Sequence, residues 1–176
     1  TKIKNKVLKR YAVLLNKEKN LILKANIKDV RFALENGLKN NLIGRLTVDQ
    51  KKLNNIKNSI NKIAKLKDPV DNTLEKWSRP NGLKINRVSI PIGVIGVIYE
   101  SRPNVTSDVA SLCFKSGNAV ILKGGSEAIN TNNILAKLFR KALKENKINE
   151  NFIQFIDTKS RKMVGFMLSK MKNYID

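Results

Sequence analysis

Three short apolar runs in the second half of the chain predict a parallel β-sheet. Residues 94–99 form a continuous run rich in β-branched side chains, and residues 119–122 form a second run of the same kind. Continuous rather than alternating hydrophobicity is typical of a strand that is buried on both faces. A third strand is expected at residues 152–156, with helix-like segments between the runs, so the pattern predicts a βαβαβ unit.

The segment after the first run is expected to be a loop that leads into a helix. Pro103 disfavours the α conformation at Arg102, so the helix is predicted to begin only at residues 106–108, where Thr, Ser and Asp are good N-terminal residues. Gly117 is expected to end it. Four apolar residues at helical spacing are expected on its buried side: Val105, Val109, Leu112 and Cys113.

The second run ends in a short glycine-containing segment. Lys123 is followed by Gly124 and Gly125, where the absence of a Cβ lets another backbone or a phosphate-bearing ligand approach closely. Ser126 and Glu127 then open a long helix. Because βαβ crossovers are right-handed, this segment and the loop after the first strand are expected at the same edge of the sheet, where open α/β sheets bind ligands.

The first 66 residues contain three helical patterns that are expected to cover the sheet. The third pattern begins with the spacing of a capping box, in which Thr47 and Gln50 satisfy each other's amides. Gly37 and Gly44 interrupt the second pattern.

Two further elements are predicted from local patterns. Residues 73–90 are expected to form two extended arms joined by a turn at residues 77–82. A final helix is expected over about residues 160–171, with a methionine-containing apolar stripe of the kind that usually fills a core.

Three segments, at residues 94–106, 112–128 and 172–176, make the chain similar to the γ-glutamyl phosphate reductases, a family of the aldehyde dehydrogenase superfamily. The first reads VIGVIYESRPNVT and the second LCFKSGNAVILKGGSEA. Weaker similarity extends the match over nearly the whole chain, at residues 26–29, 35–38 and 68–70.

The resemblance implies an α/β fold with a Rossmann-like parallel sheet and flanking helices, which is the nucleotide-binding domain of aldehyde dehydrogenases, with a short β-arm. It divides the chain into a helical cover (1–66), the β-arm (73–90) and the βαβαβ core (92–176). The implied activity is the NADPH-dependent reduction of L-glutamyl 5-phosphate to L-glutamate 5-semialdehyde in proline biosynthesis. The implied cofactor is NADP(H).

The resemblance also implies roles for individual residues. Asn104 corresponds to an asparagine that donates its amide to the oxyanion formed during catalysis. From the residues alone, the favoured role for an asparagine here is to cap the next helix. Lys123 is expected to meet the adenine ribose and its 2′-phosphate, and Glu127 the ribose hydroxyls. From the residues alone, Lys123 could be an ordinary solvated lysine and Glu127 an acid at a helix start. The implied backbone neighbours of the cofactor are Gly124, Gly125 and Ser126.

The family's nucleophilic cysteine belongs to a catalytic domain that this sequence does not contain. Cys113 is the only cysteine, and its place on an apolar helix face is typical of core packing rather than of a reactive thiolate. The chain has no histidine, so a Cys-His or Ser-His-Asp relay is excluded within it. It is therefore expected to be a truncated cofactor-binding part that is inactive alone.

The formal net charge of +21 raises an alternative function, because strongly basic domains often bind nucleic acids. However, the charge consists mostly of lysine scattered along every segment, and aromatic residues make up only 6% of the chain. Specific nucleic-acid recognition is therefore not expected. The alternative that remains is a non-catalytic binding or interaction module with affinity for polyanions.

The remaining expectations concern assembly and location. In aldehyde dehydrogenase relatives an arm such as residues 73–90 takes part in oligomerisation, so Trp77 is either an interface anchor in a homo-oligomer or a cover for the core of its own domain. No apolar run approaches the length of a membrane span, and no signal peptide is recognised. The single cysteine agrees with a reducing compartment, and a cytoplasmic location is expected.

Overall fold

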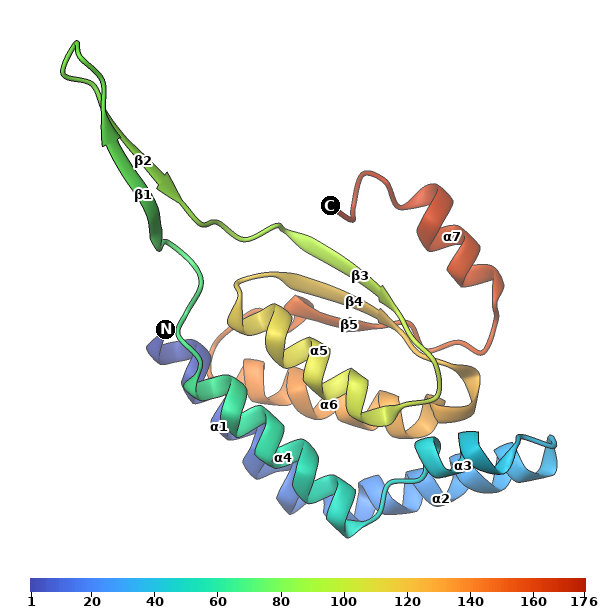
Figure 1. Cartoon of the computed structure of the whole chain (residues 1–176). Coiled ribbons are helices and arrows are strands. Elements are labelled where there is room, and N and C mark those ends of the chain that lie inside the picture. The colour runs from blue at the N-terminus through green and yellow to red at the C-terminus, as the bar shows by residue number, and fades with distance from the viewer.

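The computed structural model describes all 176 residues, and its elements alternate between helices and strands after a helical beginning (Figure 1). The first part contains α1 (Lys2–Lys17), α2 (Lys19–Glu35), α3 (Asn40–Leu46) and α4 (Gln50–Lys65). An antiparallel hairpin follows, made of β1 (Thr73–Ser78) and β2 (Lys84–Val88). The last part contains β3 (Val94–Ile98), α5 (Pro103–Lys115), β4 (Ala119–Lys123), η1 (Ser126–Ala128), α6 (Ile129–Glu145), η2 (Glu150–Phe152), β5 (Ile153–Phe155) and α7 (Lys162–Lys170).

The main sheet has three parallel strands in the order β3-β4-β5. Val94 lies opposite Ala119, and Val120 lies opposite Ile153. Helices α5 and α6 make the two crossovers and cover one face of this sheet (Figure 1). The prediction of an α/β fold with a parallel sheet and flanking helices is confirmed.

The helices of the first part form an outer layer rather than lying on the sheet. Helix α1 packs against α4, α5 and α6, while α4 packs against α5 and α2 packs against α6. These helices therefore cover the sheet only through α5 and α6, which lie between them and the strands. The apolar stripes of α5 and α6 occupy that face, and α1 and α4 bury their own stripes against the outer sides of those two helices.

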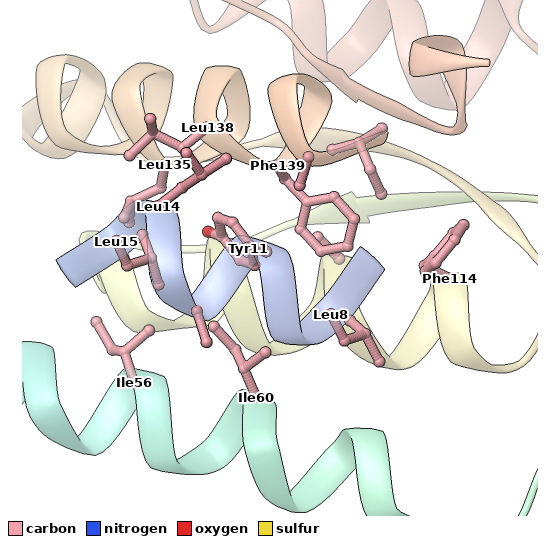
Figure 2. Close-up of a cluster of buried hydrophobic side chains, with 14 of the residues drawn as sticks. Leu8, Tyr11, Leu14, Leu15, Ile56, Ile60, Phe114, Leu135, Leu138 and Phe139 are labelled. Atoms are coloured by element: carbon pink, nitrogen blue, oxygen red, sulfur yellow. The ribbon is translucent and has the colours of Figure 1, made fainter. Parts of the chain in front are cut away.

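Helix α1 is the centre of the hydrophobic core. Figure 2 shows it between α4 and α6, with Leu8, Tyr11 and Leu15 among the side chains that fill the space. The ring of Tyr11 lies 4.5 Å from that of Phe139, measured between centroids. Its hydroxyl shares a 2.7 Å hydrogen bond with Ser107, so the buried polar atom has a partner.

Two features of the first part differ from the predictions. Helix α3 was not predicted, because its seven residues are too few to give a clear periodicity and include Gly44. The residue that caps α4 is Asp49, which accepts a 2.6 Å hydrogen bond from the backbone amide of Lys52. Thr47 instead donates its hydroxyl to the carbonyl of Ile43 at the end of α3. The predicted capping box was therefore wrong, since another helix ends where it would begin.

Strand β3 is only half-buried, in contrast to the buried strand that was predicted. Its residues have intermediate exposure, and Ile98 is 42% exposed. The face opposite α5 and α6 is approached by α7, of which Met167 alone is buried (Figure 1), and by Ile175 near the C-terminus, whose side chain lies against Gly96. A continuous apolar run is typical of a strand that is covered on both faces, but it does not show which segments provide the cover, so this difference was not visible in the sequence.

Helix α5 begins at Pro103, three residues earlier than predicted. Proline at the first position of a helix is well tolerated, because the amide that it lacks would have no partner there. The buried side of α5 also differs from the prediction, since Leu112 is 48% exposed while Ala110 and Phe114 are buried. The predicted end of the helix is confirmed by Gly117, which has a φ of +80°.

The hairpin of β1 and β2 projects away from the rest of the chain (Figure 1). All six residues of β1 are exposed, including Trp77, whose exposed fraction is 41%. Trp77 therefore does not cover the core of its own domain. The turn is closed by Gly82, which has a φ of +83° and donates its amide to the carbonyl of Arg79.

None of the helices combines the length and the apolar character that a membrane crossing requires.

Candidate functional site

A cavity of about 620 Å³ lies at the carboxyl ends of β3 and β4, where the sheet topology predicted a site. The segments after both strands line it, together with α3 and the start of α7. The volume is within the usual range for small-molecule sites. Its lining includes all five residues predicted to meet the cofactor, which are Lys123, Gly124, Gly125, Ser126 and Glu127.

Lys123 is the last residue of β4 and is almost completely buried, with an exposed fraction of 5%. Its ammonium group donates a 2.8 Å hydrogen bond to the carbonyl oxygen of Gly124. Burial lowers the pKa of this lysine, although the nearby carboxylate of Glu127 acts in the opposite direction. Lys123 is therefore not an ordinary solvated lysine. It is a desolvated cation, with two further N–H donors, at the wall of a cavity.

Glu127 is held in place by hydroxyl groups from both loops. Ser101, from the loop after β3, donates a 2.8 Å hydrogen bond to one carboxylate oxygen. Ser126 donates to the other oxygen at 3.1 Å. Burial raises the pKa of Glu127, but these hydrogen bonds, one from its own backbone amide and the charge of Arg161 together lower it below the ordinary value. Glu127 is thus an ionised acceptor that joins the two loops.

The glycine pair after β4 is needed by the protein's own packing. A Cβ at Gly124 would lie 3.1 Å from the ring of Tyr99 and would collide with the amide of Asn132. A Cβ at Gly125 would lie 2.8 Å from a carboxylate oxygen of Glu127. The sequence suggested that a ligand or another backbone approaches these glycines closely. In the structure the segment after β3 lies against them.

A buried polar network beneath the cavity was not predicted from the sequence. The hydroxyl of Tyr99 lies 2.6 Å from that of Thr106, which in turn donates to the side-chain oxygen of Asn132 at 2.9 Å. Burial raises the pKa of Tyr99 to about 12, so the phenol remains a neutral donor. The network fixes the end of β3 against α5 and α6. The sequence offered no pattern for it, because its members come from three separate elements.

The cavity has a positively charged lining. Five cationic side chains border it, against the two carboxylates of Glu100 and Glu127. The cations are Arg45, Arg102, Lys123, Lys159 and Arg161. Lys159 also lies over the ring of Phe32, with its ammonium 3.7 Å from the ring centroid. Such a lining favours an anionic ligand.

Asn104 does not line the same cavity as Lys123. It is the second residue of α5, and it borders a neighbouring cavity of about 690 Å³. Its amide donates a weak 3.3 Å hydrogen bond to Asp108, and it does not cap the helix. The prediction that Asn104 lies in a loop was wrong, because α5 begins earlier than expected. Arg45 and Arg102 border both cavities and connect them.

Two buried residues of α2 position the start of α6, and sequence reasoning gave them no role. Both carboxylate oxygens of Asp29 are engaged, since they accept bonds from the backbone amides of Asn130 and Thr131 and from the side chains of the same residues. Asn26 accepts the amide of Val48 and donates to the hydroxyl of Thr131. The only signal in the sequence was that residues 26–29 belong to the family resemblance.

Cys113 is buried, and burial raises the pKa of its thiol. This confirms the prediction that it packs in the core, since a raised pKa disfavours the reactive thiolate. The structure contains no group of three or more His, Cys, Asp or Glu side chains arranged to hold a metal ion.

Comparison with curated proteins gives consistent matches along the whole chain. The chain is 46% identical over 176 residues to the γ-glutamyl phosphate reductase of Persephonella marina, covering 100% of this chain and 39% of that protein. It is 46% identical over 173 residues to the enzyme of Clostridium tetani, covering 98% of this chain and 40% of that protein. The chain thus spans about 40% of the length of these relatives. No protein-family model matches it.

Solved structures give the same result. A crystal structure of γ-glutamyl phosphate reductase from Thermotoga maritima has a TM-score of 0.95 and 41% identity, and covers 99% of this chain and 42% of its own. The enzyme from Saccharomyces cerevisiae has a TM-score of 0.89 and 32% identity, and the match covers 99% of this chain and 44% of the yeast chain. A propionaldehyde dehydrogenase from Clostridium phytofermentans, at 16% identity and a TM-score of 0.64, shares the fold. The resemblance predicted from the sequence is confirmed.

Proposed function

We propose that this chain, which matches γ-glutamyl phosphate reductase along its whole length, forms the nicotinamide-cofactor-binding part of such an oxidoreductase. The observation that carries the proposal is the cavity at the carboxyl ends of β3 and β4, bordered by Lys123 and Glu127. A site at this edge of a parallel sheet is where α/β folds bind nucleotides.

The chemistry of the lining fits the adenosine end of NADP(H). The 2′-phosphate needs cations, and Lys123 is joined there by Arg161 near the start of α7. Glu127 is an ionised acceptor that suits a ribose hydroxyl. Three apolar side chains that line the same cavity offer a surface for the adenine ring: Ile98, Val164 and Leu168. Gly124, Gly125 and Ser126 supply backbone at close range.

In the complete enzyme, the proposed reaction converts L-glutamyl 5-phosphate, NADPH and a proton into L-glutamate 5-semialdehyde, NADP⁺ and phosphate. When bound, the cofactor supplies the hydride. This chain contributes orientation of the cofactor and, through the Asn104 amide, a donor for the oxyanion. A donor of this kind lowers a barrier by about 2.7–4 kcal/mol. The amide is available, because its present bond to Asp108 is long at 3.3 Å.

The test is a calorimetric titration of the chain with NADPH and with NADH at moderate salt. NADPH is expected to bind saturably and more tightly than NADH. Replacing Lys123 by Ala is expected to weaken NADPH binding by about 10-fold, as the loss of one charge-assisted contact costs about 1.5–3 kcal/mol. Lys84→Ala on the exposed hairpin is the matched control and should leave the affinity unchanged, since it removes the same charge far from the cavity.

Absence of binding to a chain that is folded by circular dichroism would refute the cofactor-binding proposal. Equal weakening by both substitutions would indicate that NADPH is held only by the general positive charge. That result would favour the alternative function, a non-catalytic module that binds polyanions.

A further inference from the structure

The second cavity, of about 690 Å³, lies between the α3–α4 connection and the start of α5. Eight of the twelve residues that line it have polar or charged side chains, and the other four are Gly44, Val48, Ile56 and Pro103. The charged and hydrogen-bonding residues among the eight include Arg45, Lys52, Ser59, Arg102, Asn104 and Asp108. All of these residues belong to this chain.

Asp108 is a fixed carboxylate in this cavity. Ser59 on α4 donates a 2.8 Å hydrogen bond to one of its oxygens. The other oxygen has a single weak partner, the amide of Asn104 at 3.3 Å. No cation forms an ion pair with Asp108. A positioned carboxylate with an incompletely used oxygen is suited to accept a cationic group such as an ammonium.

Two arginines supply the opposite charge. The Arg102 side chain makes no hydrogen bond or ion pair within the protein, and it borders the cavity from the loop before α5. Arg45 has only a loose contact with Glu100, at 4.0 Å between the charged atoms. Lys52 is less available, because its ammonium already donates to the carbonyls of Gly44 and Thr47. A free guanidinium binds carboxylates through two parallel hydrogen bonds.

We propose that this second cavity is the recognition site for the α-amino acid end of the substrate, with Asp108 accepting the α-ammonium group and Arg102 binding the α-carboxylate. The inference rests on the proposed function, since L-glutamyl 5-phosphate carries both groups on one carbon. Asn104 borders the same cavity, so an amino acid held by Asp108 lies beside the amide that is proposed to stabilise the oxyanion. The two charges together select a zwitterion over a simple dicarboxylate.

The test is a nuclear magnetic resonance titration of the ¹⁵N-labelled chain, without cofactor, with three probes. L-Glutamate carries both α-groups, glutarate lacks the ammonium, and 4-aminobutanoate lacks the α-carboxylate. L-Glutamate is expected to bind at least about 10-fold more tightly than either of the others, because each loses one charge-assisted contact. Its largest shifts are expected at the amides of Asn104, Asp108 and Asn55.

Asp108→Asn is the diagnostic variant, since it keeps the shape of the side chain and removes only its charge. It is expected to abolish the preference for L-glutamate over glutarate. Glu75→Gln on the hairpin is the matched control, because it changes the net charge equally but lies outside both cavities, and it should keep the preference. The wild-type comparison of probes stands even if Asp108→Asn does not fold.

Equal affinity for L-glutamate and glutarate, no binding of L-glutamate, or shifts confined to the Lys123 cavity would overturn the assignment. NADPH binding is measured separately on the same protein. Loss of NADPH binding with preserved, Asp108-dependent glutamate binding would refute the cofactor proposal and support this one. The reverse pattern would support the cofactor proposal and refute this one.

Discussion

Asp29 is a single residue on which the start of α6 depends. Its buried carboxylate accepts the amides of Asn130 and Thr131, which belong to the first turn of a helix about 100 positions later in the chain. It therefore caps α6 from another helix and satisfies amides that would otherwise be buried without partners.

Asp29→Ala is expected to lower the free energy of unfolding by about 3–5 kcal/mol, because it leaves several buried donors unpaired. The exposed cap Asp49 is the matched control, and Asp49→Ala should cost about 1 kcal/mol. Urea denaturation followed by far-ultraviolet circular dichroism measures both. Equal costs for the two variants would contradict the role assigned to Asp29.

Asp68 is a second carboxylate that joins distant segments, and its contribution depends on pH. It accepts hydrogen bonds from the ammonium of Lys4 at 2.9 Å and from the amide of Val70 at 3.2 Å. Burial raises the pKa of Asp68, but these bonds, one from the Thr1 hydroxyl and the charge of Lys4 hold it well below its ordinary value of 3.8.

A carboxyl group whose pKa is lower in the folded state than in the unfolded state stabilises the protein at a pH above the ordinary pKa. This stabilisation is lost as the pH falls towards the folded-state pKa. Asp68→Asn is therefore expected to lower the free energy of unfolding by about 2 kcal/mol at pH 7. The difference between variant and wild type should shrink as the pH falls below 3.8. Urea denaturation between pH 7 and pH 2.5 measures it, and a difference that stays constant over this range would show that the charge is not responsible.

The element that contributes least to the fold is the hairpin of β1 and β2. Its strands are exposed, and it lies apart from the core (Figure 1). We propose that it serves self-association, since an exposed tryptophan on a projecting arm is a typical interface anchor.

Trp77→Ala is expected to change the free energy of unfolding by less than about 0.5 kcal/mol, because its side chain contacts no core residue. The same substitution is expected to weaken self-association by about 10-fold or more in analytical ultracentrifugation, as a truncated interface anchor typically costs at least 2 kcal/mol. The control is Leu74→Ala on the same strand, which removes a smaller exposed side chain. Unchanged self-association in Trp77→Ala would exclude the arm as an interface centred on this residue.

At the scale of the whole molecule, the net charge of +21 acts against compactness. Only six ion pairs provide local attraction against this repulsion, and five of them have at least one exposed partner. Raising sodium chloride from about 50 to about 500 mM is expected to increase the free energy of unfolding by on the order of 1 kcal/mol, because the salt screens repulsion among the lysines. Urea denaturation measures this, and potassium chloride at the same ionic strength should increase the free energy of unfolding by the same amount. A decrease would indicate that attractive pairs dominate.

The fold could be predicted from the sequence where local patterns were strong. The strands at residues 94–98 and 119–123, the hairpin and the helix end at Gly117 followed from apolar runs, turn residues and a position that needs positive φ. Predictions failed where one element competes with another. The spacing of Thr47 predicted the N-terminal cap of a helix, but Thr47 lies at the C-terminal end of α3. Pro103 was predicted to lie in a loop before the helix, but it is the first residue of α5.

The candidate site was predicted only in part. The sequence identified the segments with Lys123 and Glu127 through their place after a strand and through the family resemblance. It could not distinguish Lys123 and Lys115, the two lysines with exposed fractions of 5% and 2%, from the solvated ones. Burial of a lysine depends on which carbonyl and amide oxygens the fold brings to its ammonium, such as Gly124 O for Lys123 and Asn5 Oδ1 for Lys115.

The sequence by itself determined the parallel βαβαβ unit and the edge of the sheet where the site lies, because hydrophobic periodicity, turn residues and crossover handedness are local or nearly local properties. The similarity to γ-glutamyl phosphate reductases came from the residues at positions 94–106, 112–128 and 172–176 rather than from these patterns. Tertiary structure decided that Asn104 and Lys123 border different cavities and that Asp29 caps α6. It also decided that Asp108 borders the second cavity with one carboxylate oxygen only weakly hydrogen-bonded. These facts depend on contacts between residues far apart in the chain, and no local pattern records such contacts.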